Sequence, residues 1–318
     1  MNTNTARSHK MCFMFPGQLL ELPTIANDIL TDKAVTEHMV LKAREITGFE
    51  WQGLYFYDPE LNRHINLRLQ LATYLISLMY CDYLMRSGIV PDVIGEHSMG
   101  IYAALVAAGA FTFEEGLELV FKIGLLIENK TEHINGAMAS IIGLTEQEIL
   151  SIFKQLSQHK LFIANYNGSK QFVLSGNEDG IDQTIEIALN EYHAVAARKL
   201  LFSAPMHSSL LESIENDLRD LLSRFSPREL RIPVVNHLTA EFCYRDEIMQ
   251  LLCEEIYKPV FWEKCVHRMK QYGVNLFVEA GYGETLQKLI RWIDQDLKVM
   301  NIRDKRSIEK VRQRLSCR

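Results

Sequence analysis

A serine in a short turn between a predicted strand and a predicted helix constrains the fold of this chain more than any other feature. Residues 93–111 read VIGEHSMGIYAALVAAGAF, and Ser98 lies between an apolar run that ends at Ile94 and a long alanine-rich stretch. A strand, a sharp turn carrying a nucleophile and a helix form the nucleophile elbow of α/β-hydrolase-like enzymes. The helix N-terminus behind the turn offers backbone N–H groups to a developing oxyanion.

The elbow motif is imperfect. Its signature is G-x-S-x-G, and this chain has Gly100 but carries Glu96 at the first glycine position. An ordinary strand-to-helix turn that happens to contain a serine is the alternative, because short motifs also occur by chance. Other motifs along the chain must decide between the two.

Composition excludes several classes of protein. The chain has 318 residues, of which 47% are hydrophobic, so it can bury the core of one large domain with a smaller insertion. A net charge of −6 predicts no nucleic-acid partner. The apolar stretches are too short for a membrane span and the N-terminus lacks a secretory pattern, so we expect a cytoplasmic protein without membrane contact. The six cysteines are scattered without metal-ligand spacing, which favours reduced thiols and predicts no metal site.

The order of predicted elements indicates the architecture. Strands are expected at 11–15, 93–94, 231–240 and 274–281, and helices over 69–86 and after the capping box of Thr112 and Glu115. Between them, a strand over 137–144, a helix capped by Thr145 and Glu148, a hairpin around Asn167-Gly168, a helix over 181–191 and a strand over 194–202 form a ferredoxin-like β-α-β-β-α-β unit.

We therefore predict an α/β fold. An α/β-hydrolase-like large domain with a central, mostly parallel sheet is expected from residues 1–131 and 202–318. The ferredoxin-like small subdomain, residues 132–201, is inserted into it. The C-terminal segment from Arg303 is locally basic and predicts a solvated helix, with a docking patch for an acidic partner as the alternative.

A serine nucleophile needs a base, which in this chain order lies downstream. Among the ten histidines, His207 stands out because SAPMHSSLL places it directly after the inserted unit, where a strand turns into a helix. A structural or surface role is commoner for any single histidine. The assignment therefore depends on the remaining motifs.

Eight motifs occur in one order: FPGQ at 15–18, GEHSMG at 95–100, GAMASIIGL at 136–144, NYNGSKQFVLSG at 165–176, SAPMHS at 203–208, PVVNHLTA at 233–240, KPVFWEKCV at 258–266 and VEAGYGETL at 278–286. With these motifs the chain resembles the malonyl-CoA:acyl-carrier-protein transacylases and the related acyltransferase domains of fatty-acid and polyketide synthases. The resemblance covers residues 11–302.

The resemblance implies roles for named residues. Ser98 would carry the acyl group as an ester, and His207 would take its proton. A backbone carbonyl near Glu255 would orient His207, and the backbone N–H groups of Gln18 and Met99 would form the oxyanion hole. Four side chains would contact the substrate: His97, Ile123, Asn167 and Met206.

The resemblance also implies partners. The donor would be an acyl-CoA, and the acceptor would be the phosphopantetheine thiol of an acyl carrier protein. Splitting thioester transfer into two steps lets one site accept from the first and donate to the second. No permanently bound cofactor is expected, and we expect a monomer.

Four positions depart from the family pattern. Ile123 stands where the family has an arginine that pairs with the malonyl carboxylate, and an isoleucine cannot form that bidentate pair. The neighbouring Lys122 points about 100° away around the helix. The other departures are Leu19 after FPGQ, Glu96 at the elbow glycine and Ile101 at a position that is usually acidic or an amide. Together they predict a pocket more apolar than a malonyl pocket.

Three functions remain open. The favoured one is a carrier-protein S-acyltransferase with a preference for neutral acyl groups. An acyl hydrolase that clears carrier proteins would differ only in letting water replace the acceptor thiol. A non-catalytic homologue that binds a carrier protein is the third, suggested by Leu19 and Glu96.

Overall fold

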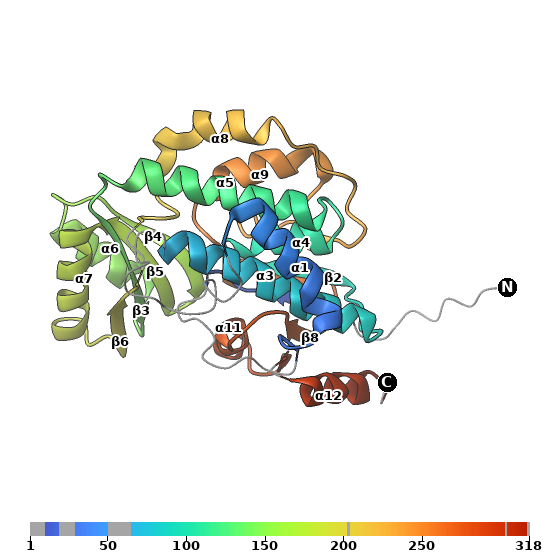
Figure 1. The fold of residues 1–318 in the computed structure, drawn as a ribbon. Helices are drawn as coiled ribbons and strands as arrows, with labels where there is room; N and C mark the ends of the chain where they lie inside the picture. Colours follow the sequence, from blue (N-terminus) through green and yellow to red (C-terminus); the bar gives the residue numbers. More distant parts are fainter. Residues whose placement is uncertain (1–9, 19–28, 50–64, 202–203, 303, 317–318) are drawn as a thin grey trace.

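The computed structural model describes residues 10–18, 29–49, 65–201, 204–302 and 304–316. Their strands form two separate sheets (Figure 1). The larger sheet belongs to the two outer parts of the chain and the smaller one to the inserted part, so the predicted α/β fold with an inserted unit is confirmed.

The larger sheet is wholly parallel and has the strand order β7-β2-β1-β8-β9. Its strands are β1 (Lys10–Phe15), β2 (Val93–Glu96), β7 (Val234–Val235), β8 (Val274–Glu279) and β9 (Lys298–Asn301). In the register of the two central strands, Phe15 lies beside Glu96. Because parallel strands end at the same edge, the FPGQ turn and the serine turn lie next to each other.

Helices cover both faces of this sheet. One core contains Phe13 and Phe15 of β1 and buried residues of α1 (Lys33–Thr47), α3 (Ile65–Arg86), α4 (Gly100–Ala107) and α5 (Phe113–Thr131). A second core packs the opposite face against α10 (Trp262–Gln271) and α11 (Thr285–Ile293). The other helices of the described residues are α6 (Glu146–Gln155) and α7 (Glu178–Asn190), which belong to the inserted part, and α8 (Glu215–Leu222), α9 (Ile248–Glu254) and α12 (Lys305–Ser316). Two 3₁₀ turns lie at Ser209–Ile214 and Arg245–Glu247.

The two predicted capping boxes are confirmed. Thr112 and Glu115 form a reciprocal capping box at α5, and Thr145 and Glu148 form one at α6. The basic C-terminal segment forms α12, as expected. None of the helices in the described ranges is long and apolar enough to cross a bilayer.

The smaller sheet is antiparallel and has the order β4-β5-β3-β6. Its strands are β3 (Gly136–Ile142), β4 (Leu161–Gly168), β5 (Gln171–Asn177) and β6 (Ala196–Lys199), with α6 (Glu146–Gln155) after the first and α7 (Glu178–Asn190) before the last. This is the ferredoxin-like arrangement. The division of the chain at residues 132 and 201 stays a proposal.

Three predicted strand limits are wrong. The hairpin turns at residues 169–170, because Asn167 and Gly168 still belong to β4. The strand predicted over 231–240 shortens to the two residues of β7, and that predicted over 194–202 shortens to β6.

The two sheets are joined by backbone hydrogen bonds beside β4. The N–H of Tyr166 donates to the carbonyl of Val260, and the N–H of Val260 donates to the carbonyl of Ala164, both at 2.8 Å. The segment after α9, which carries the KPVFW motif, is thereby fixed against the end of the smaller sheet.

Gly100 is required by close backbone packing. A Cβ atom at this position would overlap the carbonyl oxygen of Phe15 and lie 2.8 Å from that of Pro16. We expect Gly100→Ala to lower the free energy of unfolding by about 2 kcal/mol, since overpacking of this kind outweighs the gain in helix propensity. Urea unfolding measures the change.

The matched control is Gly168→Ala, because the nearest atom to a Cβ at Gly168 is 3.8 Å away. Equal stability of the two variants would contradict the close-packing explanation.

Candidate active site

Ser98 and His207 form a hydrogen-bonded pair at the carboxyl edge of the larger sheet. Ser98 lies in the turn between β2 and α4 with φ at 55°, the strained conformation of a nucleophile elbow. Its Oγ is 2.7 Å from Nε2 of His207. His207 also has a positive φ, 57°, and its backbone N–H donates to the carbonyl of Ile256 at 2.8 Å. The backbone conformation at each residue thus directs its side chain toward that of the other.

A backbone carbonyl sets the tautomer of His207. Nδ1 lies 3.1 Å from the carbonyl oxygen of Lys258, which can only accept a hydrogen bond. Nδ1 therefore carries the proton, and Nε2 is left to accept one from the Ser98 hydroxyl. Burial, followed by the nearby His237 and His97, lowers the pKa of His207 to about 3, so the ring is a neutral base at ordinary pH.

The orienting carbonyl lies further along the chain than expected. The sequence places it near Glu255, whereas the contact at 3.1 Å is made by Lys258. The Glu255 carbonyl also hydrogen-bonds to the histidine, and both bonds act to raise its pKa against the effect of burial. These carbonyls follow the end of α9, where helix carbonyls have no intrahelical partner.

The expected oxyanion hole lies beside the serine. Met99 is the N-cap of α4 and follows Ser98 directly, so its N–H belongs to those that a helix leaves unpaired at its start. The turn that carries Gln18 packs against the elbow: a Cβ on Gly17 would lie 3.0 Å from Nδ1 of His97. Leu19 lies outside the described residues, so its predicted effect on this turn stays a prediction.

One cavity of about 460 Å³ opens onto this pair, a volume typical of small-molecule sites. All nine residues for which the sequence predicts a role line it: Gln18, His97, Ser98, Met99, Ile123, Asn167, Met206, His207 and Glu255. The structure brings them together, although their roles in binding and transfer stay proposals.

One wall of the cavity is apolar. Val120, Ile123 and Ile127 line the cavity from one face of α5. Lys122, one position from Ile123, instead forms an ion pair with Glu118 at 2.5 Å and is partly exposed. Of the described residues that line the cavity, none is a lysine or arginine. Ile101 lies in the hydrophobic core and does not line the cavity.

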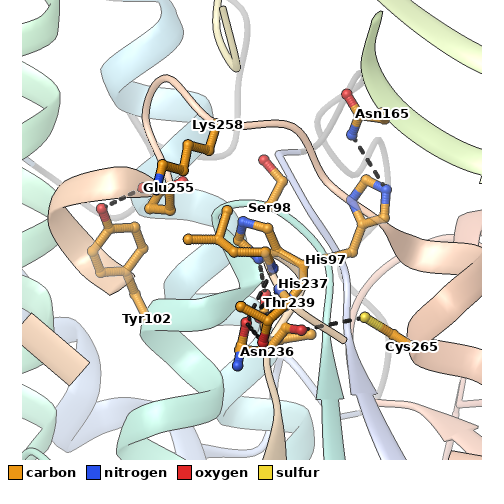
Figure 2. Close-up of polar contacts among 12 residues, drawn as sticks. His97, Ser98, Tyr102, Asn165, Asn236, His237, Thr239, Glu255, Lys258 and Cys265 are labelled. Carbon is orange, nitrogen blue, oxygen red and sulfur yellow. Dashed lines mark hydrogen bonds and ion pairs between the residues drawn. The ribbon is translucent and has the colours of Figure 1, made fainter. Parts of the chain in front are cut away.

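His97 is held by the smaller sheet. Its Nε2 lies 2.8 Å from Oδ1 of Asn167. Nδ2 of Asn165 is 3.4 Å from the same nitrogen, a contact that Figure 2 shows. Burial lowers its pKa to about 4. Asn165 was not singled out by the sequence analysis, although it belongs to the quoted NYNG motif.

Glu96 is paired with His237. Its Oε2 lies 2.6 Å from Nδ1 of His237, and its Oε1 accepts the backbone N–H of His237 at 2.7 Å. Both side chains are fully buried. Burial holds the pKa of Glu96 well above its usual value and lowers that of His237 to about 3. The sequence singles out Glu96 as a departure from the elbow motif, but it carries no signal that Glu96 pairs with His237.

Three neighbouring side chains at the site, His207 among them, are possible metal ligands. In the described part of the chain, His207, His237 and Glu255 place one ligand atom each within 4.8 Å of one another. An ion there would bind the histidine that is paired with Ser98. Glu255 already accepts a hydrogen bond from the Tyr102 hydroxyl at 2.6 Å (Figure 2). The expectation that the protein has no metal stays a prediction.

Comparisons with known proteins agree with this geometry. The family model described as the acyl transferase domain matches residues 38–308. The malonyl CoA-acyl carrier protein transacylase of Bacillus subtilis is 28% identical over 303 residues, which cover 94% of this chain and 95% of that protein. The polyketide biosynthesis malonyl CoA-acyl carrier protein transacylase PksC of the same organism is 29% identical over 290 residues, 91% of this chain and 98% of that protein.

A solved structure gives the same result. A malonyl-transacylase in complex with a type II polyketide synthase acyl-carrier protein superimposes with a TM-score of 0.87 and 26% identity, covering 96% of this chain and 99% of that one. The serine turn, the order of motifs and the two-sheet fold thus have one explanation: this chain belongs to the acyl transferase domain family and is an acyltransferase.

Proposed function

We propose that this protein transfers an acyl group from CoA to the phosphopantetheine thiol of an acyl carrier protein through an ester on Ser98. The contact between Ser98 Oγ and His207 Nε2 at 2.7 Å is the observation that carries the proposal. The names of the relatives, which are carrier-protein transacylases, support the choice of donor and acceptor. The monomeric state and the cytoplasmic location stay predictions.

In the first step, Ser98 Oγ attacks the thioester carbonyl carbon of the donor while Nε2 of His207 takes the hydroxyl proton. The negative charge on the carbonyl oxygen is stabilised by the backbone N–H groups of Gln18 and Met99. The C–S bond then breaks, the protonated His207 returns the proton to the leaving CoA thiolate, and Ser98 carries the ester.

The second step runs the same chemistry with the carrier-protein thiol as the nucleophile. His207 takes the thiol proton, sulfur attacks the ester carbon, and the proton returns to Ser98 Oγ as the C–O bond breaks. The reaction breaks one thioester and forms another, so its substrates and products have similar free energies. The buried site must mainly keep water away from the ester.

The acyl group is a neutral one in this proposal. Ile123 presents a hydrocarbon side chain where a malonyl pocket requires a cation, and the described lining offers no lysine or arginine. A buried carboxylate without its partner costs about 3–5 kcal/mol. That corresponds to about two to four decades in affinity. The names of the relatives give malonyl as the acyl group that those proteins transfer. The preference for a neutral acyl group is therefore proposed for this chain and not for its relatives.

Replacement of the nucleophile tests the proposal directly. Ser98→Ala should remove acyl-enzyme formation and leave the fold intact, because it only replaces a hydroxyl by hydrogen. Intact-mass spectrometry after incubation with acyl-CoA donors measures the ester. A gain of acyl mass on the variant would contradict the assignment, while rapid loss of the ester to water in the unchanged protein would favour a hydrolase.

Replacement of the base should slow ester formation strongly. His207→Ala should reduce the acylation rate by about 10²–10⁴-fold, since the serine then loses its proton acceptor. His97→Gln is the matched control, because His97 lines the same cavity but is hydrogen-bonded to Asn167. Rapid-quench acylation rates that fall equally in both variants would mean that the base is wrongly assigned.

The neutral preference is tested at Ile123. The unchanged protein should have a higher kcat/KM for acetyl- and butyryl-CoA than for malonyl-CoA, and Ile123→Arg should shift the preference toward malonyl. The guanidinium supplies a bidentate partner for the carboxylate and must be desolvated without compensation beside a neutral chain. Ile123→Met keeps the wall apolar and should keep the original order. A native preference for malonyl would overturn this proposal.

A further inference from the structure

Gln70 is a buried polar residue that neither the proposed chemistry nor the packing of the fold explains. It lies in α3, is 9% exposed and lines the acyl cavity. Among the residues that the structure describes, none forms a hydrogen bond with its side-chain amide. Buried amides are normally hydrogen-bonded, so this one requires an explanation of its own.

The packing of α3 against α5 places this amide at the apolar wall of the cavity. A Cβ atom on Gly124 of α5 would lie only 2.8 Å from Oε1 of Gln70, so the glycine leaves room for the amide. Gly124 shares a face of α5 with Val120, four positions earlier, and Ile127, three positions later. Both of these residues line the cavity, and the oxygen of Gln70 therefore lies on the same side of α5 as they do.

A second polar residue of α3 packs on α5 in the same way, but it has a partner. A Cβ atom on Gly116 would lie 2.5 Å from the hydroxyl oxygen of Tyr74. That hydroxyl donates a hydrogen bond to the carbonyl of Phe113 at 2.7 Å. The chain itself thus satisfies Tyr74, whereas the amide of Gln70 is left for a group that enters the cavity.

We propose that Gln70 is a specificity-determining residue that selects uncharged acyl groups carrying a hydroxyl. The proposal rests on the proposed function, because it takes the cavity to be the acyl site. A hydroxyl can donate to Oε1 and accept from Nε2, which are the two kinds of hydrogen bond that an amide offers. It supplies the polar contact that the side chains of α5 cannot supply.

The selection follows from the cost of leaving a polar group without a partner. A plain hydrocarbon chain that fills the cavity excludes water from Gln70 and leaves the amide unpaired. A hydroxylated chain of similar size restores the hydrogen bond. Sites built to hydrogen-bond a substrate hydroxyl reject the analogue that lacks it for this reason.

A carboxylated acyl group gains less from the same amide. Gln70 can donate a hydrogen bond to a carboxylate, but it carries no charge that compensates for the burial of the anion. Arg68, two positions earlier on α3, points about 200° away around the helix. Its guanidinium lies over the ring of Phe49, 5.1 Å from the centroid, and Arg68 does not line the cavity.

Equilibrium binding to the Ser98→Ala protein tests the selection without turnover. Butyryl-CoA is compared with 4-hydroxybutyryl-CoA and with both enantiomers of 3-hydroxybutyryl-CoA, and isothermal titration calorimetry gives the dissociation constants. We expect at least one hydroxylated ester to bind about tenfold more tightly than butyryl-CoA, the gain of one hydrogen bond to a neutral group.

Gln70→Met in the same background should reduce this ratio to about one. Methionine keeps a long, unbranched side chain and removes both hydrogen-bonding atoms. A loss of packing would weaken all of the esters alike, so the ratio separates specificity from structure. Gln171→Met is the matched control, because Gln171 lines the same cavity from β5, and it should leave the ratio as in the parent.

Gly124→Ala tests the placement of the amide independently. The added methyl group would lie 2.8 Å from Oε1 of Gln70 and should displace the amide from the wall. The ratio should then fall although Gln70 itself is present. An unchanged ratio would overturn the placement on which the proposal rests.

The outcomes distinguish the two proposals. A ratio of about one in the parent, a ratio that Gln70→Met leaves unchanged, or an equal loss in Gln171→Met overturns the role of Gln70 and leaves the proposed function standing. Failure of every ester to bind overturns the proposed acyl-CoA function, and the role of Gln70 falls with it.

Discussion

The site depends on the close approach of two backbone segments at the carboxyl ends of β1 and β2. Gly100 lies against the carbonyls of Phe15 and Pro16, and Gly17 lies against the backbone and side chain of His97. Side chains at either glycine would force the FPGQ turn away from the serine turn. Because both turns are expected to offer an oxyanion N–H, the distance between them decides whether one oxygen atom can be bound by both groups.

The buried pair of Glu96 and His237 explains how the elbow accepts an acid at its first glycine position. A backbone N–H and a ring nitrogen of His237 satisfy both oxygens of the Glu96 side chain. The carbonyl of His237 in turn accepts the N–H of Phe261 at 2.8 Å. The pair thus ties the strand that precedes Ser98 to the segment whose Lys258 carbonyl accepts the hydrogen bond of His207.

Features with a local cause could be predicted from the sequence, and those with a tertiary cause could not. The capping boxes and the serine turn follow from a few neighbouring residues, and the structure has them. Asn167-Gly168 has the composition of a turn, yet Asn167 stays in β4, where its side chain holds His97. Lys258 contacts His207 through its backbone carbonyl. Every residue type has this group, so the sequence could not indicate the contact.

The four departures from the family pattern have different consequences once they are placed in space. Ile101 packs in the core and Glu96 lies beneath the elbow, so neither supplies an atom to the cavity wall. Ile123 does line the cavity, and Leu19 lies outside the described residues. The groups expected to carry out the transfer are positioned by backbone geometry, whereas side chains of α5 form an apolar wall of the cavity. A change of acyl preference therefore requires no change in the catalytic geometry.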